Sequence, residues 1–128
     1  MGYTIDRTIG NADFGAVDAR VRAALGKHGF GVLTEIDVKA TMKKKLDKDM
    51  DDYRILGACS PEMAWQAIGM EPRVGAMLPC NVILRSVDGG VEVSAIDPEA
   101  SMTAIPNAGL KAVAGQVRAM LEKVVADV

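Results

Sequence analysis

Two cysteines are the side chains of this sequence best suited to chemistry. Cys59 ends an apolar segment and Cys80 begins another, and they are the only cysteines in the chain. In both places a segment of strand type meets a change of backbone direction, where a scaffold can present a reactive group without disrupting its core. Thiols attack sulfur electrophiles and bind soft metals. Cys59 and Cys80 are therefore the candidate thiol site.

The residues around Cys59 predict how that site is supported. Ser60 is suited to the N-cap of a following helix and Pro61 to its first position. The positive end of the helix dipole favours the thiolate form of Cys59. Gly57 shares the strand face of Cys59 and should leave room there for a small ligand. If the two strands pair antiparallel, the thiols are neighbours, with Pro79 beside them.

A structural role fits the same cysteines, because free cysteine is among the most buried residue types. Two thiols also underfill a tetrahedral metal site, which would need Met77, Met102, a partner subunit or an exogenous ligand. The single histidine, His28, argues against zinc sites built from several imidazoles. No metal or other cofactor is assigned, and without a complete catalytic set the sequence does not decide whether the protein is an enzyme.

A second candidate site is a polar face formed by Glu35, Asp37 and Lys39. These residues alternate with apolar ones between residues 30 and 39, the period of a half-buried strand, and share their face with Leu33. The two carboxylates would suit acid–base chemistry or a hard cation. A solvated sheet face is the other interpretation.

The surrounding sequence predicts the elements that must position these residues. Period-two alternation and a glycine-rich turn at residues 88–90 predict five strands. Helical spacing and capping residues predict helices between them. The class is α+β, a mostly antiparallel sheet with helices packed on one face, and the partly apolar second face predicts a homodimer. The expected strands are 3–9, 30–39, 53–59, 80–87 and 91–97, and the expected helices are 14–28, 61–70 and 107–124. Residues 40–52 are expected to form a short amphipathic helix or an ordered excursion, and residues 98–103 a brief helical turn.

The composition of the chain limits the number of domains and the classes of partner. A chain of 128 residues that is about half apolar fits one domain, residues 1–128. A formal charge of −2 gives no general attraction to nucleic acid or anionic lipid. The sequence shows neither a signal-peptide pattern nor an apolar run of the roughly 20 residues that span a membrane. We therefore expect a cytoplasmic protein without nucleic-acid or membrane partners.

Three ordered segments, residues 35–43, 53–61 and 75–82, resemble the signatures of the domain of unknown function family 302. The resemblance implies a small prokaryotic α+β domain, commonly dimeric, with no established activity. It also implies a sulfur or redox role, because some relatives occur alongside sulfur-handling proteins. Relatives usually have asparagine where this chain has Ser60, a difference that leaves helix capping intact but weakens any role that needs the amide. The motif positions include Glu35, Asp37, Lys39, Cys59, Pro61, Pro79 and Cys80.

Two functional hypotheses follow. In the first, Cys59 is the activated thiolate and Cys80 its resolving or co-ligating partner, handling a sulfur species or a soft metal or cofactor. In the second, the protein is a non-catalytic module, which either uses Glu35, Asp37 and Lys39 to hold a small polar molecule in a dimer cleft or serves only as a structural dimer.

Overall fold

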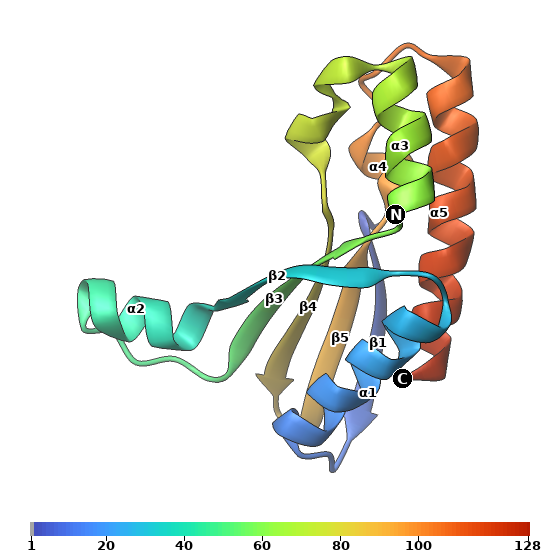
Figure 1. Ribbon diagram of the computed structural model, residues 1–128. Helices are drawn as coiled ribbons and strands as arrows, with labels where there is room; N and C mark the ends of the chain where they lie inside the picture. Colours follow the sequence, from blue (N-terminus) through green and yellow to red (C-terminus); the bar gives the residue numbers. More distant parts are fainter. Residues whose placement is uncertain (1) are drawn as a thin grey trace.

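The computed structural model describes residues 2–128 and contains one five-stranded sheet in the order β1-β5-β4-β3-β2 (Figure 1). Every neighbouring pair of strands is antiparallel. The expected α+β class with a five-stranded antiparallel sheet is therefore confirmed. The strands are β1 (Thr4–Gly10), β2 (Gly31–Asp37), β3 (Tyr53–Cys59), β4 (Cys80–Val87) and β5 (Gly90–Ile96).

Two long helices, α1 (Phe14–Lys27) and α5 (Ala108–Asp127), cover one face of the sheet (Figure 1). Both begin at side-chain caps that accept backbone N–H groups, as the sequence predicts. Their apolar stripes pack against alternate residues of the strands to form the core. The largest fully buried side chains include Leu25 and Leu121 from the helices and Leu56 and Leu84 from the strands.

Three shorter elements lie beyond the strand ends. Helix α3 (Pro61–Met70) follows β3 directly, and the 3₁₀ helix η1 (Pro72–Met77) leads on towards β4. Helix α4 (Pro98–Ser101) follows β5. Figure 1 shows α3 alongside the N-terminal half of α5. On α3, Ile68 is exposed.

Helix α2 (Val38–Leu46) extends away from the rest of the molecule at the end of β2 (Figure 1). None of its residues is buried, and its Leu46 is 62% exposed. Asp37 caps its start, so β2 ends two residues earlier than the expected limit at Lys39. No helix within residues 2–128 has the length and apolar character needed to cross a bilayer.

A bulge in β2 changes which side chains face the helices. The register against β3 shifts between Val32 and Thr34, so residues on either side of the bulge do not keep a simple alternation. Glu35 consequently lies on the face covered by α1, whereas Ile36 points to the other side. We call this uncovered side the open face, defined by the cross-strand row Asp6, Ser94, Ile83, Ile55 and Ile36.

Candidate functional site

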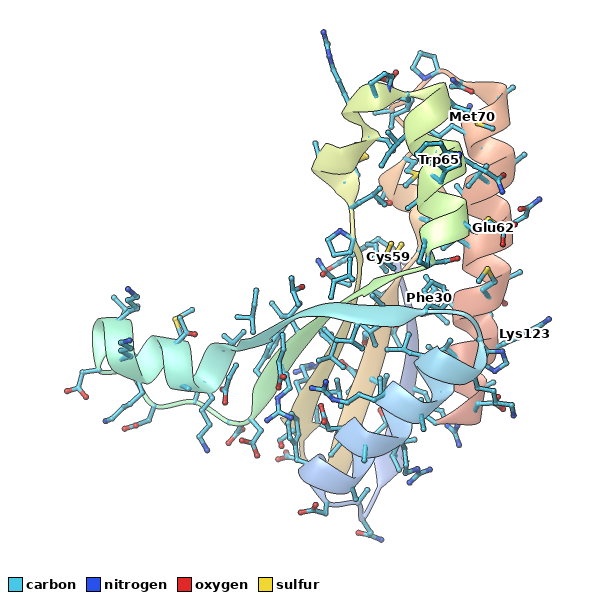
Figure 2. The ribbon with its side chains drawn as sticks, viewed as in Figure 1. Phe30, Cys59, Glu62, Trp65, Met70 and Lys123 are labelled. Carbon is cyan, nitrogen blue, oxygen red and sulfur yellow. The ribbon has the colours of Figure 1, made fainter. Side chains whose placement is uncertain are left out.

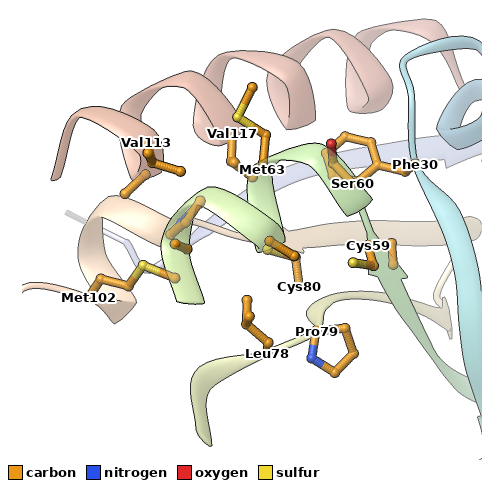
Figure 3. A pocket seen from close by; sticks show the side chains of 15 residues that line it. Phe30, Cys59, Ser60, Met63, Leu78, Pro79, Cys80, Met102, Val113 and Val117 are labelled. Atoms are coloured by element: carbon orange, nitrogen blue, oxygen red, sulfur yellow. The ribbon is translucent and has the colours of Figure 1, made fainter. Parts of the chain in front are cut away.

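A pocket lies where the end of β3 and the start of β4 meet α3, α4 and α5 (Figure 3). Its volume is about 30 Å³, roughly twice the 10–15 Å³ that a cavity needs to hold one water molecule. No charged side chain lines it, and Ser60 is the only lining residue with a hydroxyl or other oxygen-bearing polar side chain. The pocket is lined by Phe30, Ala58, Cys59, Ser60, Met63, Ala64, Ala67, Leu78, Pro79, Cys80, Pro98, Met102, Val113, Ala114 and Val117.

Both cysteines contribute to this pocket. Ala58 lies opposite Cys80 in the β3–β4 ladder, Cys59 is the next residue of β3, and both cysteines line the pocket (Figure 3). The expected antiparallel pairing of these strands is thus confirmed. Both thiols are free: Cys59 is partly exposed, and Cys80 is buried with 7% of its surface exposed.

The two thiols differ in acidity for a physical reason. Burial in apolar surroundings disfavours a charged sulfur, and a second thiolate at Cys59 would repel it further. Together these effects raise the pKa of Cys80 to about 11. Cys80 is therefore a neutral thiol at pH 7, and of the two cysteines Cys59 is the accessible one.

The start of α3 lies directly after Cys59 (Figure 2). Ser60 occupies the N-cap position and Pro61 the first helical position, as predicted, but the Ser60 side chain makes no capping hydrogen bond. The expected side-chain cap is therefore absent. The backbone N–H groups of Glu62 and Met63, which point towards the start of the helix, donate no hydrogen bond to the Ser60 hydroxyl. Their partial positive charge remains available beside the thiol.

The space expected beside Gly57 is filled. A β-carbon built on Gly57 would overlap Thr34 Oγ1 and would lie 2.8 Å from Pro79 Cγ. The glycine is needed because the side chains of Thr34 and Pro79 meet across it, so it does not open a ligand site. The pocket instead lies on the helix side of the strand ends.

The predicted polar face of Glu35, Asp37 and Lys39 does not assemble. Glu35 pairs with Arg22 at 3.1 Å and with Arg54 at 3.3 Å. Asp37 Oδ1 instead accepts a hydrogen bond from the Ala40 N–H at 2.9 Å, capping α2. Lys39 belongs to α2 and lies 3.6 Å from a carboxylate oxygen of Asp52. The bulge in β2 and its early end separate the three residues.

An ionic cluster lies between α1 and the β2–β3 edge. Its Asp18–Arg22 pair has the i,i+4 spacing of a helix ion pair, whereas its contacts with Glu35 and Arg54 have no local signal in the sequence. Arg22 Nε donates to Asp18 Oδ2 at 2.9 Å, and Arg54 Nη1 lies 3.0 Å from Asp18 Oδ1. Burial alone would raise the pKa of Asp18, but the hydrogen bonds and charges of the two arginines hold it below its ordinary value. Arg54 also lies over the Phe14 ring, 5.3 Å from its centre. The balanced charges stabilise the fold near β3.

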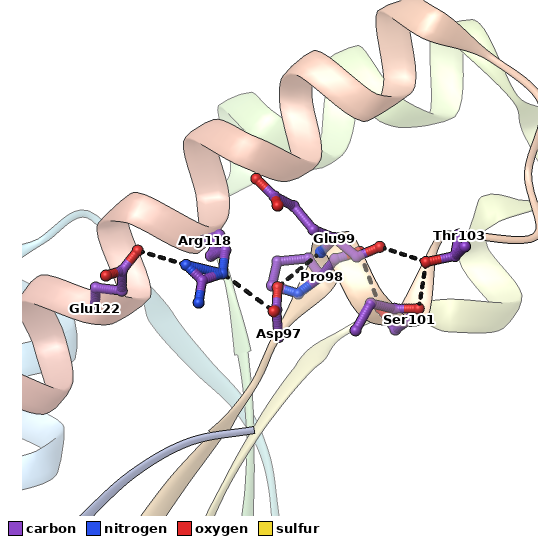
Figure 4. A network of polar contacts seen from close by, with 8 residues as sticks. Asp97, Pro98, Glu99, Ser101, Thr103, Arg118 and Glu122 are labelled. Carbon is purple, nitrogen blue, oxygen red and sulfur yellow. Dashed lines mark hydrogen bonds and ion pairs between the residues drawn. The ribbon is translucent and has the colours of Figure 1, made fainter. Parts of the chain in front are cut away.

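A second polar network fixes the α4 wall of the pocket (Figure 4). Asp97 accepts a hydrogen bond from the Glu99 N–H at 3.0 Å, which caps α4. Arg118 of α5 donates to the other Asp97 oxygen at 3.1 Å and to Glu122 at 2.9 Å. These bonds tie the start of α4, and with it Pro98, to α5.

Within residues 2–128 no three or more His, Cys, Asp or Glu side chains gather closely enough to hold a metal ion. Of the two methionines named as possible extra ligands, Met102 lines the pocket and Met77 does not. His28 lies near the end of α1, with Nε2 2.6 Å from Asp127 Oδ2. The lining residues Met63, Leu78 and Val113 carry no local signal of a site, because only packing brings them together.

Comparison with known proteins agrees with this fold. No curated protein matches the chain. A crystal structure described as that of an uncharacterized conserved protein DUF302 from Bacillus stearothermophilus matches with a TM-score of 0.90 at 20% sequence identity. The match covers 98% of this chain and 97% of the other, and at this identity it shows the fold alone. Residues 5–128 also match the model of DUF302, a domain of unknown function, and the chain therefore belongs to the DUF302 family.

Proposed function

We propose that this protein is a thiol-dependent binding domain in which Cys59 reacts with a small sulfur compound held in the apolar pocket. One observation carries the proposal: the only two cysteines of the chain, from different strands, line the same pocket at the start of a helix. A purely structural role would not require one of them to stay partly exposed.

The proposed reaction is thiol–disulfide exchange. The Cys59 thiolate attacks one sulfur of a compound R–S–S–R′, a Cys59–S–S–R bond forms, the S–S bond of the compound breaks, and R′–S⁻ leaves and takes a proton from water. The start of α3 stabilises the attacking thiolate. In its thiolate form Cys80 then attacks the Cys59 sulfur, a Cys59–Cys80 disulfide forms, the Cys59–S–S–R bond breaks and R–S⁻ leaves and takes a proton from water; the raised pKa of Cys80 makes this second step slow at pH 7.

The test uses dimethyl trisulfide, an uncharged sulfur donor, and peptide-resolved mass spectrometry of the native protein. We expect a methylthio group on Cys59 in the wild type and in Cys80→Ser, and none at position 59 in Cys59→Ser. The proposal fails if Cys59 remains unmodified until urea unfolds the protein, or if both cysteines react at the rate of an unfolded chain. Circular dichroism of each variant establishes that it is folded.

A second candidate role, a homodimer, is favoured by the open face. Leu33 and Ile36 are 66% and 46% exposed, and the row Ile36, Ile55 and Ile83 follows the register of three strands. Helix α2 has only nine residues and buries none, and isolated helices that short are marginal in water. A second copy packed on this face and on α2 would cover both.

Sedimentation equilibrium tests the dimer. The wild type should sediment as a dimer, and Ile36→Lys should shift it to the monomer by placing a charge in the apolar row. Ala119→Lys is the control, because Ala119 is exposed on α5, which lies on the opposite side of the sheet from the open face. A monomeric wild type at high protein concentration, or equal effects of the two substitutions, would contradict the assembly.

A further inference from the structure

The chemistry of the pocket wall restricts which sulfur compounds can reach Cys59. Apart from Ser60 and the two thiols, every lining side chain is a hydrocarbon or a thioether. No lysine, arginine or histidine lines the pocket to neutralise an anion, and no carboxylate lines it to neutralise a cation. An ion that leaves water for such surroundings without a partner loses several kcal/mol of solvation.

The start of α3 does not remove this restriction. The helix end carries only about half of a positive charge, and in the proposed reaction the Cys59 thiolate already uses it. The one ionisable side chain in the first turn of α3 is Glu62, which is exposed and negative. A second negative charge brought by the reacting compound would therefore meet repulsion as well as a desolvation cost.

The size of the pocket gives a second restriction. Its volume of about 30 Å³ holds only one or two heavy atoms unless the lining side chains move. Met63 and Met102 are flexible enough to admit slightly more. Ala114, from α5, has 2% of its surface exposed and lines the pocket. A larger side chain there would fill the space.

We infer that the pocket admits uncharged, apolar sulfur compounds whose group transferred to Cys59 is about as large as methylthio, and that it discriminates against charged and bulky sulfur compounds. This inference rests on the proposed function and adds its substrate class. Thiosulfate-like and tripeptide-thiol compounds, which carry net charge, are excluded from the site on this basis.

Methanethiosulfonates test the inference, because they deliver groups of different charge and size by the same reaction. The Cys59 thiolate attacks the sulfenyl sulfur, a Cys59–S–S–R bond forms, the S–S bond of the reagent breaks and methanesulfinate leaves. Four probes are compared on the wild type: methyl, sulfonatoethyl, trimethylammonioethyl and benzyl methanethiosulfonate. Mass spectrometry resolves the rate at Cys59, and the urea-unfolded chain gives the intrinsic rate of each probe.

For each probe, the rate at folded Cys59 is divided by its rate with the unfolded chain. We expect this normalised rate to be at least about tenfold higher for the methyl probe than for each of the two charged probes and the benzyl probe. Equal normalised rates for all four probes would overturn the inference while leaving the proposed function intact. Complete lack of reaction in the folded protein would overturn both. Preference for the anionic probe would also overturn the inference, since it would reveal an anion site at the helix start.

Ala114→Val provides an independent check, with Ala119→Val as its matched control at an exposed position of the same helix. We expect Ala114→Val to slow the methyl probe at Cys59 several-fold and Ala119→Val to leave its rate unchanged. Equal rates in the two folded variants would show that the reacting group does not occupy this pocket. If Ala114→Val does not fold, Val113→Ile, which enlarges another lining side chain, replaces it.

Discussion

Cys80 lies directly opposite Ala58 in the β3–β4 ladder, so the next residue of β3, Cys59, is brought beside a thiol that is distant in sequence. The same arrangement gives the two sulfur atoms unequal surroundings, because Cys80 faces the core and Cys59 lies at the strand end. Their reactivities should differ accordingly.

Alkylation by iodoacetamide at pH 7 should label Cys59 about 100-fold faster than Cys80. A thiol whose pKa is about 11 is almost entirely protonated at this pH, and alkylation requires the thiolate. Mass spectrometry of the native protein measures both rates, and the urea-unfolded chain is the control in which they should converge. Faster labelling of Cys80 in the folded state would contradict the assigned roles.

Stability should fall as the pH rises from about 9 towards 11, in part because of Cys80. Its pKa is raised in the folded state, to about 11, so the unfolded chain loses the proton first and deprotonation favours unfolding. The effect approaches about 2 kcal/mol at the upper end. Urea unfolding of Cys80→Ala should depend less steeply on pH over this window than unfolding of the wild type, and parallel curves would exclude the cysteine as the cause.

Gly57→Ala should lower the free energy of unfolding by about 2 kcal/mol or more. The added methyl group would overlap Thr34 Oγ1 and press against the Pro79 ring. Thr34→Ala removes one of these contacts, so the double variant should recover part of the loss in a urea-unfolding mutant cycle. Purely additive effects would show that Thr34 is not the obstructing group. Gly26→Ala is the control, because no heavy atom lies within 4 Å of its added β-carbon.

Asp18→Asn should destabilise the protein by about 2 kcal/mol at pH 7, because it leaves two arginines with one carboxylate. The pKa of Asp18 is lowered in the folded state. The stabilisation by its carboxylate is therefore present at pH values above the ordinary pKa of an aspartate, and it is lost as the pH falls through and below that pKa. The difference in unfolding free energy between wild type and variant should therefore shrink in acid. Asp6→Asn, at an exposed position of β1, should show neither effect.

Asp97→Ala should cost about 1–2 kcal/mol, since it removes the cap of α4 and the partner of Arg118. Because α4 forms one wall of the pocket, Cys80 should also become more accessible to alkylation. Native-state labelling followed over time measures this opening. Asp13→Ala is the control, because it removes the cap of α1, a helix that contributes no residue to the pocket. It should lower stability without the same selective rise in the alkylation rate of Cys80.

Local sequence determined much of the scaffold. Alternating and helical periodicities located the five strands and the long helices within a few residues, and the Asp88-Gly89 turn joins β4 and β5 as expected because glycine accepts a positive φ, here +79° at Gly89. Ser60-Pro61 placed the start of α3 for an equally local reason. The two thiol positions at strand ends were also evident from the sequence.

Tertiary structure decided the surroundings of the side chains in the candidate sites. A bulge in β2 moved Glu35 from an open sheet face to an ionic cluster under α1, an effect that strict alternation does not encode. Packing of Thr34 and Pro79 filled the space predicted at Gly57. The pocket, its apolar wall and the raised pKa of Cys80 come from α3, α4 and α5 meeting at the strand ends. Side-chain periodicity is a local property of the backbone, whereas burial and charge neighbours depend on which distant segments pack together.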